Sequence, residues 1–427
     1  MKKNATILCL TLLVALCASA ITQDHSLDRQ SRIYGLSLIW SESKHNYVNY
    51  DHLPFDWDSL YLAYLPQVID ATDDFAYYRL LQRFCAQLND GHSAVYLPQE
   101  LRAKWLRNFP IWVRLVEGRA IVTSVFSSEV RDAGITGGME ITYIDGTPIH
   151  QYAAENVRPY IFASTEENRD FRTYAYELFR GPRDSGITLT VRDDNNHSAD
   201  HRFERSLKWD LWTERAPWTF EMLEDSIALL TVNTFDNNEF YAFFDSIYND
   251  IYAARALIID IRNNGGGSSS YGYHLLGHLV DKTFSGTTWH SRQEIPKVNA
   301  GDPDASWFMS RRPRFHPQAD SIYYKPVALL IGNGTFSAAE DFAATFDYLD
   351  RGLLIGGRTG GSSGQPIRFD LPGGGQFKVC TERNSYPDGR EFVGIGVLPN
   401  IEVKTTVADI RAGRDPQLAR ALAELSP

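Results

Sequence analysis

A serine that opens a predicted helix directly after a buried strand is the first residue that could do chemistry. The apolar run Pro326–Ile331 is typical of a strand, and Gly332 and Gly334 follow it before Ser337. Such a turn would expose the Ser337 hydroxyl at the carboxyl end of a parallel sheet, where open α/β sheets form their sites. Free N–H groups of the first helical turn would face a developing oxyanion there. Ser337 is therefore a candidate nucleophile, although it could simply be an N-cap with Glu340 completing a capping box.

A second strand-to-helix turn carries three glycines. Ala256–Asp260 is a continuous apolar strand, and Gly265–Gly267 separates it from a helix predicted at about 271–280. Glycines let the backbone approach a ligand and can offer N–H groups to an anion. A Gly-Lys-Ser/Thr sequence does not follow, which excludes a phosphate-binding loop. The turn either supports a site or is a flexible connection.

A serine hydroxyl needs a general base, and His92 is the candidate. It follows the Asn89–Gly91 turn, and histidine, with a reference pKa of about 6.5, is the usual partner of such a serine. A lone histidine is more often structural, and the chain has 11. His274 and His278 have the HxxxH spacing, but Leu275 stands where a zinc peptidase carries its glutamate. We therefore expect neither a metal nor any other cofactor.

Three regions of different periodicity must position these residues. Residues 21–106, which include the His92 turn, have the apolar spacing of helices. Residues 107–207 have short alternating strands and predict a small α+β module. Residues 208–427 alternate strand and helix, which predicts an α/β domain with right-handed crossovers. Within it, residues 285–325 are rich in Pro, Arg and His and predict a long surface excursion.

Residues 1–20 have the pattern of a secretory signal peptide. Lys2 and Lys3 precede an apolar run that ends in Ala18-Ser19-Ala20, and the run is shorter than the roughly 20 residues of a spanning helix. Cys17 raises the alternative of a lipoprotein, which the bulky Leu16 disfavours. We expect an exported protein, periplasmic or secreted, without a membrane span.

Composition constrains the partners further. The 427 residues carry a net charge of -11 with 43% hydrophobic residues, which is typical of a globular protein and does not favour nucleic acid as a partner. Cys85 and Cys380 remain after the signal peptide and could be paired or free. The oligomeric state is not constrained.

Several of these motifs together resemble one family, the C-terminal-processing (tail-specific) serine peptidases. The turn Leu88–Ser93 is similar to the histidine-bearing turn of the tricorn-core branch of that family. The resemblance covers about Leu88 to Leu425 and implies a catalytic α/β domain of crotonase-like (ClpP/crotonase-type) architecture. The matching motifs are Asp260–Gly267, Thr335–Glu340, Gly394–Val403 and Asp415–Leu418.

The resemblance also assigns roles to single residues. The tail-specific branch has a catalytic lysine where this chain has Ser362, so the base should be His92, as in the tricorn-like branch. Glu391 is the preferred carboxylate to orient His92, with Asp388 or no third residue as alternatives, because Val393 occupies the aligned position. The backbone N–H groups of Gly266 and Ala338 would form the oxyanion hole.

The activity implied is that of an exported serine endopeptidase acting on extended or unfolded polypeptides. Within residues 107–207, the segments Val122–Phe126 and Gly138–Gly146 resemble a PDZ-like domain, which could add a peptide as a strand or be purely structural. Because the same fold also builds retinoid-binding modules, a non-catalytic ligand- or peptide-binding protein is one alternative. A hydrolase of small esters is the other.

Overall fold

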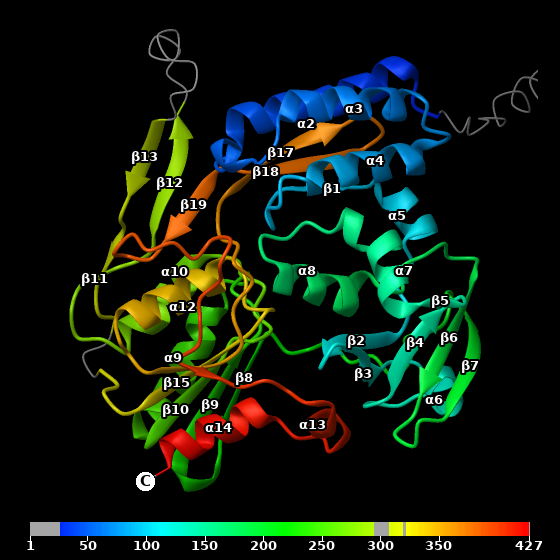
Figure 1. Cartoon of the computed structure of the whole chain (residues 1–427). Helices are drawn as coiled ribbons and strands as arrows, with labels where there is room; N and C mark the ends of the chain where they lie inside the picture. Colours follow the sequence, from blue (N-terminus) through cyan, green and yellow to red (C-terminus); the bar gives the residue numbers. More distant parts are fainter. Residues whose placement is uncertain (1–25, 294–306, 319–321, 427) are drawn as a thin grey trace, which may run out of the picture.

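The computed structural model describes residues 26–293, 307–318 and 322–426. The predicted signal peptide, with Cys9 and Cys17, lies outside these residues. The helices at the top of Figure 1 form the N-terminal layer. Asp28, Asp56 and Asp73 cap the three longest of them by accepting hydrogen bonds from first-turn N–H groups. The elements of this layer are α2 (Arg29–Asn46), η1 (Tyr50–His52), α3 (Trp57–Ile69), α4 (Asp74–Ala86) and α5 (Gln99–Trp105).

A small antiparallel sheet joins this layer to a distant part of the chain. Strand β1 (Ala94–Tyr96) pairs with β18 (Gly375–Cys380), which pairs in turn with β17 (Pro366–Leu371). Buried side chains of the two later strands pack in one core with those of the helices. Cys85 and Cys380 both belong to this core and are free thiols. The turn that carries His92 is therefore held between α4 and a hairpin that follows it by almost 300 residues in sequence.

The middle of the chain forms a β-module with its own core. Its sheet has the order β2-β3-β4-β6-β7, with β5 paired to β4. Strands β3, β4 and β6 are among the short alternating strands that the sequence predicts for residues 107–207. The elements are β2 (Ile111–Val116), β3 (Arg119–Val125), α6 (Ser128–Asp132), β4 (Glu140–Ile144), β5 (Thr147–Pro148), α7 (Ile149–Asn156), η2 (Arg158–Tyr160), α8 (Glu166–Arg172), the π-helix η3 (Thr173–Glu177), β6 (Gly186–Arg192) and β7 (Ser198–Glu204).

The α/β domain is built on a six-stranded sheet of order β20-β16-β15-β10-β9-β8, parallel except for the β8 edge. Helices α9, α10 and α12 cover one face and α14 covers the other (Figure 1). Strands β10 and β15 are buried along their whole length, as their continuous apolar sequences predict. The elements are β8 (Trp218–Met222), η4 (Glu224–Ser226), β9 (Ile227–Val232), α9 (Phe240–Ala253), β10 (Ala256–Asp260), α10 (Ser269–Gly277), β15 (Val327–Ile331), α12 (Ala338–Tyr348), β16 (Leu353–Gly356), β20 (Ile401–Glu402), α13 (Val407–Arg411) and α14 (Pro416–Leu425).

The predicted excursion at 285–325 is more regular in the structure than its polar sequence indicates. Its described part contains an antiparallel pair, β12 (Thr288–Gln293) with β13 (Trp307–Arg311), and β12 also pairs with β19 (Glu382–Ser385). A shorter pair, β11 (Phe284–Ser285) with β14 (Arg314–Phe315), lies at its base. Cross-strand hydrogen bonds compensate here for the weak apolar pattern.

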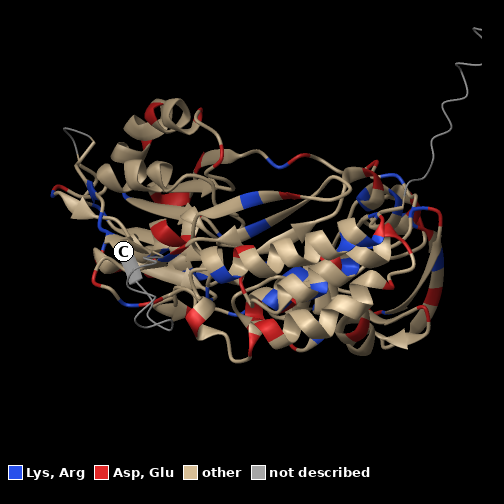
Figure 2. Cartoon of the chain, turned by 90° about the horizontal axis from the view of Figure 1, so that it is seen from above, with Lys and Arg blue, Asp and Glu red and all other residues tan. Residues whose placement is uncertain are grey.

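The end of the chain returns to the β-module. Val407 of α13 packs against Val116 and Ile121, and the Arg411 guanidinium donates to the carbonyl of Gly138. Acidic and basic residues are interspersed along the described chain (Figure 2). Among the residues that the structure describes, no helix has an apolar stretch long enough to span a lipid bilayer.

Candidate active site

Ser337 lies at the end of the turn between β15 and α12, directly before the helix, as predicted. Its φ of 59° and ψ of -127° are a strained backbone conformation for a residue other than glycine. The turn before it is held close to the neighbouring strand, since the Thr335 hydroxyl donates to the carbonyl of Ile261 at 2.9 Å. A Cβ atom at Gly334 would lie 2.6 Å from the carbonyl oxygen of Arg262, so only glycine fits there. Local packing thus holds the serine in its strained position.

His92 reaches this serine from the N-terminal layer. Its backbone N–H donates to Asp90 Oδ1 at 2.8 Å, which closes the turn. Phe336 stacks on the imidazole with 4.8 Å between ring centroids and 15° between ring planes. The structure brings together the two residues that the sequence singled out: Nε2 of His92 lies 3.0 Å from Oγ of Ser337.

The surroundings keep the imidazole neutral. Burial, together with the positive charges of Lys378 and Arg172, lowers the pKa of His92 from 6.5 to about 3. A neutral imidazole has one nitrogen able to accept a proton, which is the state a general base requires. The Arg172 guanidinium lies over the Phe336 ring at 4.7 Å from its centroid. The stack of Arg172, Phe336 and His92 therefore shields the base from water.

Ser362 occupies the other side of the imidazole. Its Oγ lies 2.8 Å from Nδ1 of His92, and its side chain is buried. The carbonyl of Ser362 accepts a hydrogen bond of 3.0 Å from the N–H of Ser337, so the two serines are fixed relative to each other. Three residues from three separate segments thus form a line from one hydroxyl through the imidazole to the other hydroxyl.

Glu340 holds the backbone around this line. Its buried carboxylate accepts hydrogen bonds from the Thr359 hydroxyl at 2.6 Å and from the N–H groups of Gly361 at 2.7 Å, Ser362 at 2.9 Å and Ser337 at 3.2 Å. Burial raises the pKa of Glu340 to about 8, and the four donors act in the opposite direction. The capping-box interpretation was therefore incomplete, because Glu340 connects the turn of Ser337 to the loop of Ser362.

The predicted carboxylates lie elsewhere. The side chain of Glu391 is about half exposed and forms an ion pair with Arg383 at 3.7 Å. Asp388 pairs with Arg390 at 2.8 Å. Neither contacts the imidazole, whose two ring nitrogens face hydroxyl groups. The sequence motif placed Glu391 near the site, but the pairing of Ser385 with Glu391 across a turn directs this segment to the surface.

The two predicted oxyanion donors differ in their availability. The N–H of Ala338 has no acceptor among the described residues. The N–H of Gly266 already donates to Asn264 Oδ1 at 2.9 Å. Gly266 nevertheless lies directly against the nucleophile, because a Cβ there would be 2.6 Å from Cβ of Ser337. The site as it stands offers one free donor and one that is engaged within its own loop.

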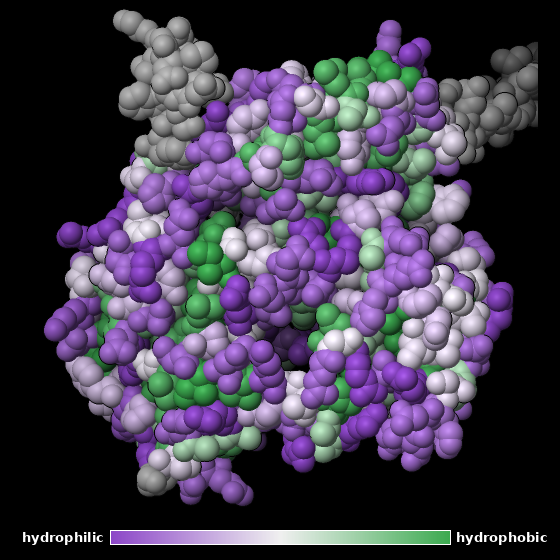
Figure 3. Space-filling model, viewed as in Figure 1, coloured by the Kyte–Doolittle hydropathy of each residue, from purple (hydrophilic) through white to green (hydrophobic). Residues whose placement is uncertain are grey.

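A cavity of about 210 Å³ lies beside the Arg172 stack. It lies between the N-terminal layer and the β-module. The face drawn in Figure 3 has a separate hollow near its centre, where the β-module meets the α/β domain. Its wall combines aromatic and cationic side chains, among them Arg79, Tyr96, Tyr160, Phe162 and Arg172.

Comparisons with known proteins relate part of the chain to one peptidase family. The model of peptidase family S41 matches residues 226–403. This part of the chain is a peptidase family S41 domain. The matched range contains Ser337, Glu340 and Ser362, whereas His92 comes from outside it.

At least three relatives of this chain are at or above 30% identity. An uncharacterized protein of Chlamydia muridarum is 34% identical over 101 residues, which cover 23% of this chain and 17% of that protein. The chloroplastic C-terminal processing peptidase of Tetradesmus obliquus is 30% identical over 151 residues, which cover 35% of this chain and 29% of that protein. The chain thus spans less than a third of the length of these relatives.

A solved structure extends the likeness beyond the S41 domain. Mature CPAF complexed with lactacystin superposes with a TM-score of 0.71 at 17% identity, over 93% of this chain and 97% of that one. The N-terminal layer and the β-module therefore belong to a fold shared with that protein.

Sequence reasoning missed the contact between Ser362 and the imidazole of His92. Ser362 was recognised only as the residue that replaces a lysine, because its distance to His92 depends on the path of the loop after β16. The available signal was the run Thr359–Gly364, in which small residues allow a buried turn.

Proposed function

We propose that this chain is an exported serine endopeptidase that hydrolyses peptide bonds in extended or unfolded polypeptides. The observation that carries the proposal is the 3.0 Å contact between Ser337 Oγ and His92 Nε2 at a strained strand-to-helix turn. A family S41 domain that contains this serine supports the same reaction. The Tetradesmus relative is itself named a C-terminal processing peptidase.

The proposed reaction begins with proton transfer. Ser337 Oγ forms a bond to the scissile carbonyl carbon while its proton moves to Nε2 of His92. The same proton then passes from Nε2 to the leaving amine nitrogen as the C–N bond breaks. Water repeats the sequence on the acyl-enzyme and releases the acid.

We propose Ser362, in place of Glu391, as the group that orients the base. With the Nδ1 proton of His92 donated to Ser362 Oγ at 2.8 Å, Nε2 keeps its lone pair directed at Ser337. Glu340 supports this arrangement by holding the backbone N–H groups of Ser337 and Ser362. A hydroxyl carries no charge, so it fixes the tautomer with less stabilisation of the imidazolium than a carboxylate would give.

The oxyanion would be bound by the N–H of Ala338, with Gly266 as second donor. One such donor contributes about 2.7–4 kcal/mol to catalysis in the best-studied case. Because Asn264 Oδ1 engages the Gly266 N–H, the second donor becomes available only when that bond is shared or released. Substrate binding would therefore complete the oxyanion hole by drawing the Gly266 N–H away from Asn264.

The substrate would lie against Ser337 and His92, beside the cavity next to Arg172. Aromatic and cationic groups around the cavity beside Arg172 suit an aromatic or acidic side chain of a polypeptide. Strand β2 is an edge of the β-module sheet, so this module could bind an extended peptide as an added strand in the manner of a PDZ-like domain.

A fluorophosphonate probe tests the proposal. We expect labelling of the purified protein, none in Ser337→Ala, and strongly reduced labelling in His92→Gln. Absence of labelling in the wild type between about pH 6 and 9 would instead favour a binding protein on the same fold. A labelled serine with turnover of small esters but not of unfolded polypeptides would favour the esterase alternative.

A further inference from the structure

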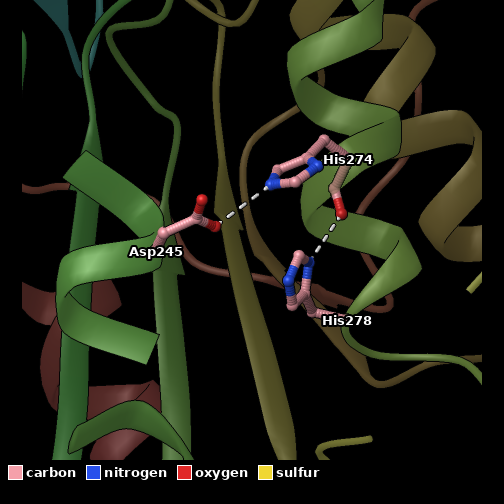
Figure 4. A group of neighbouring side chains, drawn as sticks. All are labelled: Asp245, His274 and His278. Carbon is pink, nitrogen blue, oxygen red and sulfur yellow. Dashed lines mark hydrogen bonds and ion pairs between the residues drawn. The ribbon is translucent and has the colours of Figure 1, made fainter. Parts of the chain in front are cut away.

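Asp245, His274 and His278 form a second cluster of chemically capable side chains. Asp245 comes from α9, His274 lies on α10, and His278 is the residue directly after the last residue of α10, one helical turn beyond His274 (Figure 4). Each side chain offers one potential ligand atom, and these three atoms lie within 4.8 Å of one another. The HxxxH spacing alone did not predict a metal site; the structure adds a carboxylate from the neighbouring helix.

The hydrogen bonds of His278 leave one of its nitrogens available. Its Nδ1 lies 3.0 Å from the carbonyl oxygen of His274, and a carbonyl can only accept. Nδ1 therefore carries the proton and Nε2 carries the lone pair. Figure 4 shows Nε2 on the side of the ring that faces Asp245. A backbone carbonyl that fixes the tautomer in this way is the usual support of a metal-binding histidine.

His274 has a buried nitrogen with no hydrogen bond. Its Nε2 is 3.6 Å from Asp245 Oδ1, beyond hydrogen-bonding distance, and the described residues provide it with no other partner. A neutral imidazole therefore has only a long contact with the carboxylate, and an ion placed between the two groups would give each of them a closer partner.

Aromatic side chains hold the two rings in place. Tyr241 lies edge-on to His274 at 4.8 Å between ring centroids, and Phe244 lies edge-on to His278 at 5.0 Å. Asp245, by contrast, has an exposed side chain whose contact with His274 is long, at 3.6 Å. Ligand atoms of a tetrahedral zinc site are about 3.3 Å apart, given bonds of about 2.0–2.1 Å. Rotation of the Asp245 side chain toward the two imidazoles would shorten the distances between the three ligand atoms, now within 4.8 Å, to those of a zinc site.

We propose that Asp245, His274 and His278 bind one divalent transition-metal ion, with a water molecule as fourth ligand. Two imidazoles and one carboxylate suit zinc, copper or nickel better than magnesium or calcium, which prefer oxygen ligands. The ion would connect α9 to the C-terminal end of α10. The first residue of α10 lies two positions after Gly267. The site is separate from the proposed peptidase site and does not depend on it.

Zinc titration of the untagged, chelator-treated protein tests the proposal by calorimetry. We expect one zinc ion per chain and at least tenfold weaker binding in Asp245→Asn, His274→Gln and His278→Gln. Addition of cobalt should give the visible absorption of a tetrahedral site in the wild type only. Equal zinc affinity in the wild type and all three variants, or no binding by the wild type, would overturn the proposal.

A matched control is present in the β-module. His197 Nδ1 lies 3.6 Å from Asp193 Oδ2, the same separation as in the cluster but without a second histidine. His197→Gln should leave zinc binding unchanged. Because His278 is buried and its replacement could disturb folding, Asp245→Asn, at an exposed position, is the decisive variant. Zinc should raise the melting temperature of the wild type and not that of Asp245→Asn.

Discussion

The hydroxyl of Ser362 lies 2.8 Å from Nδ1 of His92, on the side of the imidazole opposite Ser337. In many serine hydrolases a carboxylate fills this position. Here the buried carboxylate of Glu340 acts on the two serines through their backbone N–H groups instead.

Replacing Ser362 by alanine should therefore lower kcat by about 10²-fold with little change in KM, because the imidazole loses its orientation while the substrate contacts remain. Steady-state kinetics on an unfolded polypeptide or a fluorogenic peptide measures this split. Ser363→Ala is the matched control, since its hydroxyl donates to Asp341. Glu391→Gln should have a small effect; a larger loss in that variant than in Ser362→Ala would return Glu391 to the role first predicted for it.

Two adjacent glycines should respond in opposite ways to alanine. In Gly266→Ala the new Cβ would lie 2.6 Å from Cβ of Ser337, at a φ of +100°, so fluorophosphonate labelling should fall by about 10²-fold or more. In Gly265→Ala the new Cβ has no neighbour within 4 Å, and labelling should be retained. Equal labelling of the two variants would contradict the contact between Gly266 and the nucleophile.

The low pKa of His92 predicts how stability depends on pH. Its folded-state pKa of about 3 lies below the reference value of 6.5, so between these values the unfolded chain binds a proton that the folded chain does not. The free energy of unfolding should therefore decrease as pH falls from about 6.5 toward 3. Urea unfolding at a series of pH values should show this loss in the wild type and a smaller one in His92→Gln. If the free energies of unfolding of the wild type and His92→Gln fell by the same amount over this pH range, the imidazole would lie in a more polar environment than the structure shows.

Glu340→Gln should destabilise the protein by about 1–3 kcal/mol, because the amide nitrogen would face N–H groups that need an acceptor. Chemical denaturation measures the difference. Glu424→Gln, at an exposed ion pair with Arg420, should change stability by a few tenths of a kcal/mol. If both variants unfold alike, Glu340 does not hold the loop of Ser362.

The parts of the site that depend on local sequence were predictable. Strand β15, its two glycines and the helix after Ser337 follow from a continuous apolar run with turn residues behind it. The contact of Ser362 with His92 and the exposure of Glu391 were not, because they depend on how the loops after β16 and β19 pack. The resemblance indicated His92, but its distance to Ser337 depends on the pairing of β1 with β18, a contact between distant parts of the chain.

That pairing also determines when the site can exist. Ser93, next to the proposed base, accepts a hydrogen bond of 3.0 Å from the N–H of Cys380, near the end of the chain. A ribosome has made His92 and Ser337 well before it adds the β18 strand that holds them together. A nascent chain would therefore carry both residues without the geometry of the site until β18 has been synthesised and has paired with β1.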